Sequence, residues 1–291
     1  MGQQALNGVF VGSIYALFAV GYTLVFGVLD ILNLAHAAVF TLAAFIALAL
    51  VDAHLPLWLA LPLAVAAAGL IGIVLERLAF RPLRGRADSN ISGLISSLAM
   101  ATVFEAIALQ IFGPDVSRFP QGTFPDRTIQ IGGASASFLQ LCIVGTSVVL
   151  MAVLTLLLAR TRLGRQIRAV AESPRAARIL GVNVDRAIAM AFFLSSALGG
   201  AAGVLFGLAF NSISPDVGRS VELKGLAVII LGGMGSVPGA LVAGFALGLI
   251  EVFTVAHLGS SFRDAVSFAV LFLVLIARPH GLFGRAAARE A

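Results

Sequence analysis

The sequence is poor in charge. Of its 291 residues, 11% are Asp, Glu, Lys or Arg, whereas 59% are hydrophobic, and the mean hydropathy is +1.03. Soluble domains usually carry about 25% charged residues. Too few charges are therefore present to cover the surface of a water-soluble globular enzyme. The same apolar content excludes a disordered chain.

Residues and motifs that carry chemistry are also scarce. The single cysteine, Cys142, excludes an internal disulfide and a Cys-based metal cluster. The sequence has no Gly-x-x-x-x-Gly-Lys-Ser/Thr phosphate loop, and it has no His-Glu-x-x-His, Gly-x-Ser-x-Gly or Cys-x-x-Cys pattern. We therefore expect a protein that is not an enzyme, does not hydrolyse ATP itself and carries no metal or other cofactor.

Long apolar runs dominate what is present. A helix needs about 20 apolar residues to cross a bilayer, and the absence of a two-residue alternation favours helices over a β-barrel. Small residues four apart, such as Gly8 and Gly12 or Gly244 and Gly248, favour close helix packing in lipid. We predict an all-α, polytopic transmembrane bundle of about eight to nine membrane helices, forming one domain over residues 1–291. The runs fall at 5–29, 31–51, 56–79, 91–112, 138–159, 187–210, 223–232, 239–256 and 264–277.

The basic residues predict an orientation. Fourteen of the 19 Lys and Arg residues lie in 77–86, 160–186 and 278–291. Loops rich in Lys and Arg favour the cytoplasmic side, which places these segments and the C-terminus in the cytoplasm and the N-terminus outside. Nucleic-acid-binding proteins are also basic, but these arginines collect between apolar runs, so we expect a lipid bilayer and no nucleic acid.

Two polar stretches interrupt the runs. Residues 232–239 contain four glycines and a proline, which predicts either a broken helix that lines a passage or a tight hairpin turn near the cytoplasmic face. Residues 30–36 form either an ordinary loop or, as their low glycine and proline content suggests, a helix that kinks or unwinds.

Polarity and position select candidate residues for a translocation path. For the tyrosines and serines among them, hydrogen bonding between helices is the alternative role. Ionisable groups within the runs are few, chiefly Asp30, His36, Glu105 and Glu251, and such groups are costly in lipid. So few groups would make a poor proton relay, which counts against a secondary transporter that works alone. The candidate path residues are Tyr15, Tyr22, Thr23, Asn33, His36, Ser96, Ser97, Gly233, Gly235 and Ser236.

The long basic segment 160–186 is predicted to form short helices in the cytoplasm. Ser173 followed by Pro174 is typical of a helix start, and Gly181 is typical of a helix end. The segment is either a docking element for a cytosolic partner or a basic loop on anionic head groups.

Taken in order, these motifs resemble the membrane permease subunit of branched-chain amino acid ABC importers. The resemblance covers nearly the whole chain and rests on Asn7-Gly8, Gly21-Tyr22-Thr23, Phe26-Gly27, Asn33-Leu34-Ala35-His36, Glu76-Arg77, Arg81-Pro82, Arg162-Leu163-Gly164-Arg165, Arg168-Ala169, Ala171-Glu172, Leu180-Gly181-Val182-Asn183, Asp185-Arg186, Leu231 to Gly239, and Arg278 to Gly284.

The resemblance implies a multi-pass protein of the bacterial inner membrane that works with a second permease subunit, two cytosolic ATPase subunits and a periplasmic solute-binding protein. It also implies that 160–186 holds the coupling helix, with Arg168, Glu172, Arg175, Ala176, Ala177 and Gly181 as contact residues. Arg175 stands where the family signature Glu-Ala-Ala-x-x-x-Gly has glutamate, so Glu172 is the candidate for the acidic contact. The implied cargo is a branched-chain amino acid; the alternatives are urea or short amides, or a stand-alone secondary transporter.

Overall fold

The computed structural model describes residues 1–84, 89–120, 122–125, 127–131, 134–278 and 280–284. Arg86, Arg285 and Arg289, which belong to the predicted cytoplasmic segments, lie outside these residues. In chain order the elements are α1 (Gly2–Leu29), α2 (His36–Asp52), α3 (Leu57–Leu75), a π-helical turn (Glu76–Phe80), a 3₁₀ turn (Arg81–Leu83), α4 (Ser89–Phe112), β1 (Thr128–Ile131), β2 (Ala134–Ser137), α5 (Phe138–Arg160), α6 (Arg162–Glu172), α7 (Pro174–Ile179), α8 (Val184–Phe210), α9 (Val217–Gly232), α10 (Val237–Leu258), a second 3₁₀ turn (Ser260–Phe262) and α11 (Arg263–Ala277).

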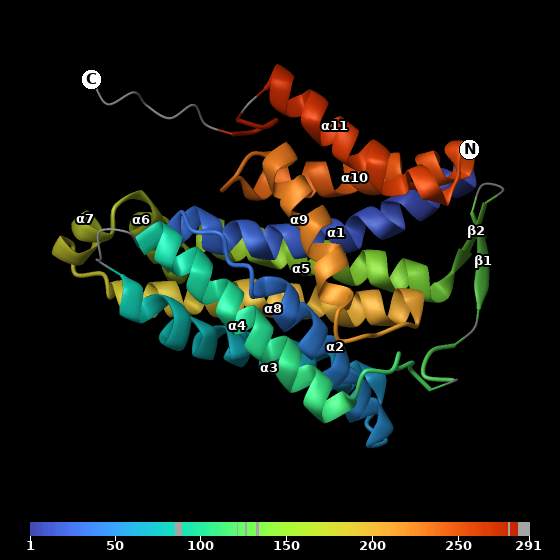
Figure 1. The fold of residues 1–291 in the computed structure, drawn as a ribbon, viewed down its shortest axis with the longest axis horizontal. Coiled ribbons are helices and arrows are strands. Elements are labelled where there is room, and N and C mark those ends of the chain that lie inside the picture. The colour runs from blue at the N-terminus through green and yellow to red at the C-terminus, as the bar shows by residue number, and fades with distance from the viewer. Residues whose placement is uncertain (85–88, 121, 126, 132–133, 279, 285–291) are drawn as a thin grey trace.

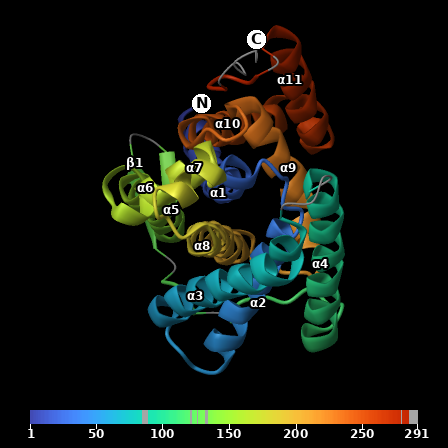
Figure 2. The ribbon, with the colours of Figure 1, turned by 90° about the vertical axis from the view of Figure 1, so that its left-hand side faces the viewer.

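The long helices lie side by side, with α6 and α7 at one end of the bundle and β1 and β2 at the other (Figure 1). We call these the α6–α7 end and the hairpin end. Viewed from the α6–α7 end, α1 and α8 occupy the middle and α3, α4, α5 and α11 surround them (Figure 2). In the most apolar stretch of α1, 89% of the residues are buried, against 6% in the last span, which ends with α11. The apolar faces of the outer helices are therefore left for lipid or for another subunit.

Seven helices within the described residues are long and apolar enough to cross a membrane. α2 is a shorter apolar helix of 17 residues, and α9 has 16 residues. The expected polytopic helical bundle is thus confirmed as a class, whereas its count of about eight to nine membrane helices stays a prediction.

One short element of the otherwise helical bundle is a β-hairpin, which the sequence did not predict. β1 and β2 pair antiparallel, with Thr128 opposite Ser137 and Ile129 opposite Ala136. The alternation of polar and β-branched apolar residues in β1 suits a strand, but four residues are too few to stand out in a scan for long runs. The Gln3 side chain donates to the Ser135 carbonyl at 2.9 Å, which ties this hairpin to the start of α1.

Glycines bring α1 and α10 into backbone contact. A methyl group on Gly12 would lie 2.8 Å from the Phe245 Cα, and one on Gly8 would lie 2.9 Å from the Leu249 Cα. Gly248 in turn packs directly on Gly12. These contacts confirm that the glycines spaced four apart mark a close helix crossing.

The second glycine-rich stretch is a turn between two helices. α9 ends at Gly232 and α10 begins at Val237, where the Ser236 hydroxyl accepts the Gly239 N–H at 3.2 Å as an N-cap. Gly233 adopts φ of 98°, a conformation that favours glycine. The structure therefore has a hairpin turn here. α9 starts six residues before the predicted run 223–232, because its polar first turn is held by Arg219, which pairs with Glu105 of α4 at 2.6 Å.

Candidate functional site

The chain between α1 and α2 returns into the bundle without helical structure. α1 ends at Leu29, and Asp30 takes a left-handed conformation with φ of 55°. α2 then starts at His36, whose ring lies 4.8 Å from the Phe18 ring and 5.3 Å from the Tyr22 ring of α1. Phe18 precedes the end of α1 by 11 residues, or about 16 Å of helix. The N-terminus of α2 therefore lies well inside the bundle, which agrees with the predicted unwinding.

Polar side chains gather where α2 begins. Tyr22, Asn33 and His36 are each at most 1% exposed. Within the described residues, the Tyr22 hydroxyl, both polar side-chain atoms of Asn33 and both ring nitrogens of His36 make no hydrogen bond of ordinary geometry. We call these three residues the uncharged cluster. Buried polar groups without partners are rare in proteins and call for an explanation.

Two serines of α4 support the non-helical segment and the end of α3. The Leu34 N–H donates to the Ser97 hydroxyl at 3.2 Å, and that hydroxyl donates to the Leu94 carbonyl at 2.8 Å. Ser96 donates to the Ala79 carbonyl at 2.9 Å. Open backbone inside a membrane protein has to be satisfied by other groups. Both serines therefore make the hydrogen bonds between segments that were their alternative role.

A second polar group is charged, and its opposite charges are paired, although the Glu251 Oε2 has no hydrogen-bond partner among the described residues. Lys224 of α9 donates from Nζ to the Glu251 carboxylate of α10 at 2.6 Å and to the Tyr15 hydroxyl at 3.2 Å. Arg263, the first residue of α11, also bonds Glu251, and the Asp264 carboxylate lies 3.3 Å from the Lys224 Nζ. Glu251 is fully buried. We call these five residues the charged cluster; they join four helices.

A cavity of about 970 Å³ opens near the α6–α7 end, between α1, α5, α6 and the turn before α10. It is lined by Thr23 and Gly27 of α1, Arg168 of α6, and Gly235 and Ser236 of the turn. The structure thus brings three predicted path residues (Thr23, Gly235, Ser236) to one cavity, together with one predicted coupling residue, Arg168. Gly235 lies beside Gly27, and a methyl group on Gly235 would be 3.7 Å from the Gly27 Cα.

The basic segment forms two short helices at the end of the bundle. The Thr161 hydroxyl caps α6 by accepting the Gly164 N–H at 3.0 Å, and the Ser173 hydroxyl caps α7 by accepting the Ala176 N–H at 3.2 Å. Gly181 follows α7 with φ of 81°. The predicted start and end of the second short helix are therefore confirmed. A hydrophobic pair at the end of α7, Ile179 and Leu180, is 82% and 79% exposed.

An ion network joins the turns that follow α3 to the first turn of α8. Asp185, near the start of α8, pairs with Arg81 at 3.0 Å and with Arg84 at 3.1 Å, and Arg84 also pairs with the buried Glu76. Burial lowers the pKa of the Arg84 guanidinium, and the carboxylate of Asp185 acts against that shift. The end of α3 and the start of α8 are thereby linked next to α7.

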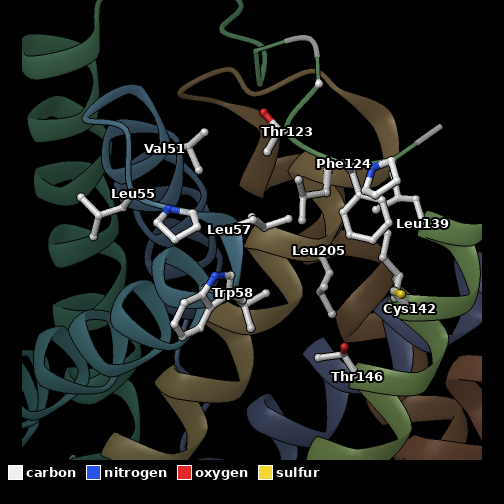
Figure 3. A pocket seen from close by; sticks show the side chains of 16 residues that line it. Val51, Leu55, Leu57, Trp58, Thr123, Phe124, Leu139, Cys142, Thr146 and Leu205 are labelled. Carbon is white, nitrogen blue, oxygen red and sulfur yellow. The ribbon is translucent and has the colours of Figure 1, made fainter.

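A second cavity, of about 570 Å³, lies toward the hairpin end (Figure 3). Trp58 and Leu57 of α3, Phe124 of the loop between α4 and β1, and Leu139 and Cys142 of α5 surround it (Figure 3). Among the described residues, none of its lining side chains is charged. The cavity therefore offers no counter-charge for an ionic solute.

The predicted path residues thus fall in four places. Tyr15 belongs to the charged cluster, and Tyr22, Asn33 and His36 lie where α2 begins. Ser96 and Ser97 lie on α4. Gly233, Gly235 and Ser236 form the turn at the α6–α7 end, and Thr23 lines the cavity beside this turn. Lys224, Arg263 and Asp264 were missed. One feature of the sequence could have pointed to this cluster: Lys224 is the one lysine of the sequence, and it lies at the start of an apolar run.

Fold and sites together define a multi-pass helical membrane protein with inward-facing polar groups and a basic, exposed end. The sequence model of the family described as "Branched-chain amino acid transport system / permease component" matches residues 4–275. The chain belongs to this family.

Named relatives agree with that assignment. The chain is 34% identical to the high-affinity branched-chain amino acid transport system permease protein BraD of Pseudomonas aeruginosa, and 34% and 33% identical to the permease proteins LivH of Salmonella typhimurium and Escherichia coli. Each match covers 97% of this chain and 95% of the relative.

Proposed function

We propose that this chain is the permease subunit of an ABC importer that moves branched-chain amino acids across the bacterial inner membrane. The observation that carries the proposal is the family match over residues 4–275, together with relatives that are named for branched-chain amino acid transport. Neither urea nor short amides appear in those names. In this proposal a second permease subunit, two cytosolic ATPase subunits and a periplasmic solute-binding protein complete the importer.

In this proposal the α6–α7 end lies in the cytoplasm, and the hairpin end lies on the outer side of the membrane. The basic residues of 160–186 support this orientation. α2 and α9 then lie within the membrane beside the seven longer spans, which gives nine membrane helices with the N-terminus outside and the C-terminus in the cytoplasm.

Coupling to ATP hydrolysis is assigned to α6 and α7. Two separate serine and threonine caps give these helices defined ends, and the exposed Ile179 and Leu180 offer an apolar contact flanked by Arg175 and Arg178. An exposed apolar pair on a basic surface suits a protein partner better than it suits water. Arg168 of α6 also lines the cavity beside Gly235. A movement of α6 would therefore change the shape of this cavity.

The uncharged cluster is assigned to the path. Its polar atoms make no hydrogen bond of ordinary geometry within the part of the chain that the structure describes, and the non-helical segment 30–35 lies beside it. Broken helices of this kind frame substrate sites in transporters. A second conformation or a passing solute would supply the missing hydrogen bonds.

The test is uptake of radiolabelled L-leucine into cells that express the chain with the importer subunits encoded beside it. We expect uptake by the wild type to depend on ATP. We expect a double Ile179→Ser, Leu180→Ser variant to reduce uptake to background at unchanged membrane abundance, because both side chains are exposed and their loss leaves the bundle intact. Gly181→Val should act likewise, because valine strains the left-handed conformation after α7.

The matched control is Ile111→Ser near the C-terminal end of α4, where the original side chain is 67% exposed and the helix has run to the end of the bundle opposite α7. It should retain uptake. Full uptake by the double α7 variant would refute the coupling role, and uptake of urea without uptake of leucine would refute the assigned cargo.

A further inference from the structure

The charged cluster lies on the wall of a cavity of about 450 Å³. The cavity opens between the ends of α8, α9 and α11 and reaches Tyr15 on α1. Its size falls in the range of small-molecule sites, about 300–1,000 Å³. Three phenylalanines line it, namely Phe206, Phe210 and Phe268.

The charges on this wall are of both signs and close together. Lys224, Arg263 and Asp264 line the cavity, whereas the fully buried Glu251 lies behind them and compensates for one of the two cations. The Lys224 Nζ and the Asp264 Oδ1 are 3.3 Å apart. Asp264 is 66% exposed at its side chain, so this ion pair can open without unfolding the helices.

We propose that this cavity is a transient binding site for an α-amino acid with an aliphatic side chain. The α-carboxylate would insert at Lys224 and Arg263, the α-ammonium at Asp264, and the aliphatic group against the phenylalanines. One ion pair is exchanged for two, so net charge in the cavity is conserved. The inference rests on the proposed function and adds to it a place where the cargo touches the permease.

The apolar wall also discriminates between cargoes. Urea has no apolar group to bury, and its uncharged ends would leave Lys224 and Asp264 paired with each other. An aliphatic amine or an aliphatic acid would satisfy one sign of charge only. A zwitterion with a branched apolar side chain is the chemistry that matches all three features.

Site occupancy can be measured by cysteine protection in the full-length chain. Ser220 lines the cavity and is exposed, so a Ser220→Cys variant in a Cys142→Ser background places one reactive thiol at the site. Membranes are treated with methyl methanethiosulfonate in the presence and absence of L-leucine. At about ten times the Kd the site is free about a tenth of the time, so labelling should slow about tenfold.

Five controls make the result specific. 4-Methylpentanoate, which lacks the ammonium, and 3-methylbutylamine, which lacks the carboxylate, should protect far less than L-leucine. Lys224→Met and Asp264→Asn should each abolish protection. A Ser260→Cys thiol, exposed at the same end of the bundle but outside the cavity, should label at the same rate with and without leucine.

Three results would overturn the site: equal protection by the three compounds, no protection by L-leucine, or protection that survives Lys224→Met. The charged cluster would then be a purely structural network. Leucine uptake by the assembled importer is measured in parallel. If uptake occurs without protection at Ser220→Cys, the site fails and the proposed function stands; if wild-type uptake of leucine is absent, the proposed function itself fails.

Discussion

Tyr15 and Tyr22 lie on α1 seven residues apart, so they face nearly the same way about 10 Å apart along the helix, yet their hydroxyls meet opposite surroundings. The Tyr15 hydroxyl contacts Lys224 at 3.2 Å and Glu251 at 3.2 Å, whereas the Tyr22 hydroxyl has no partner among the described residues. The charged cluster is therefore a paired junction of four helices. The uncharged cluster is a set of polar atoms left open in this conformation.

This contrast predicts which variants lower the stability of the protein first and which lower transport first. Removing a partner from a paired buried group costs free energy, whereas removing a polar group that had no partner costs little or even stabilises. Changes in the charged cluster should therefore lower stability first. Changes in the uncharged cluster should affect movement of solute first.

The largest effect is expected from Glu251→Gln. This change leaves Lys224 and Arg263 beside a neutral amide in a buried site, and breaking a buried ion pair in this way costs about 3–5 kcal/mol. The measurement is the thermal unfolding midpoint of the purified chain in detergent. Combining Glu251→Gln with Lys224→Met should recover a large part of the loss, because both members of the pair are then removed. A wild-type midpoint for Glu251→Gln alone would show that the cluster does not hold the helices together.

The helices themselves could be predicted from the sequence because their signal is local. An apolar run of the right length predicts a span, and Ser173, Pro174 and Gly181 predict the start and end of α7 through backbone hydrogen bonding near each residue. The glycines of α1 and α10 were also informative, because a residue without a side chain is needed wherever two backbones touch.

The charged cluster could not be predicted in this way because its members are far apart in sequence. Lys224 and Glu251 are separated by 27 residues, and Tyr15 by more than 200. Lys224 and Arg263 lie at the edges of apolar runs, and a basic residue in such a position gives no sign of an inward partner. The three-dimensional crossing of α1, α9 and α10 supplies that partner.

A smaller effect is expected where the uncharged cluster is packed, at Gly199 of α8. A methyl group there would lie 2.5 Å from the His36 Cε1, and the His36 ring is held by Phe18 and Tyr22. Gly199→Ala should therefore destabilise by about 1–3 kcal/mol through overpacking. Gly145→Ala on α5 is the matched control, because nothing lies within 4 Å of its added methyl; it should be neutral or slightly stabilising. Equal midpoints for the two variants would mean that His36 yields freely and that the cluster is loosely packed.

The smallest effect tests the contrast most directly, because the chain has two tyrosines and both can lose their hydroxyl by the same substitution. Tyr15→Phe removes a hydrogen bond to charged partners and should cost about 0.5–2 kcal/mol, the lower value being typical of hydrogen bonds between membrane helices. Tyr22→Phe removes a hydroxyl without a partner and should leave the unfolding midpoint unchanged or slightly raised.

Leucine uptake by the two tyrosine variants gives a second comparison of the clusters. If the Tyr22 hydroxyl acts only when solute passes or when the bundle changes conformation, Tyr22→Phe should lower the rate of leucine uptake although the protein is as stable as the wild type. A structural tyrosine gives the reverse pattern, in which uptake falls only as far as the amount of folded protein falls. Should Tyr22→Phe lose stability and Tyr15→Phe keep it, the open atoms of the uncharged cluster would have partners in the membrane, and the division between a paired junction and an open path would have to be abandoned.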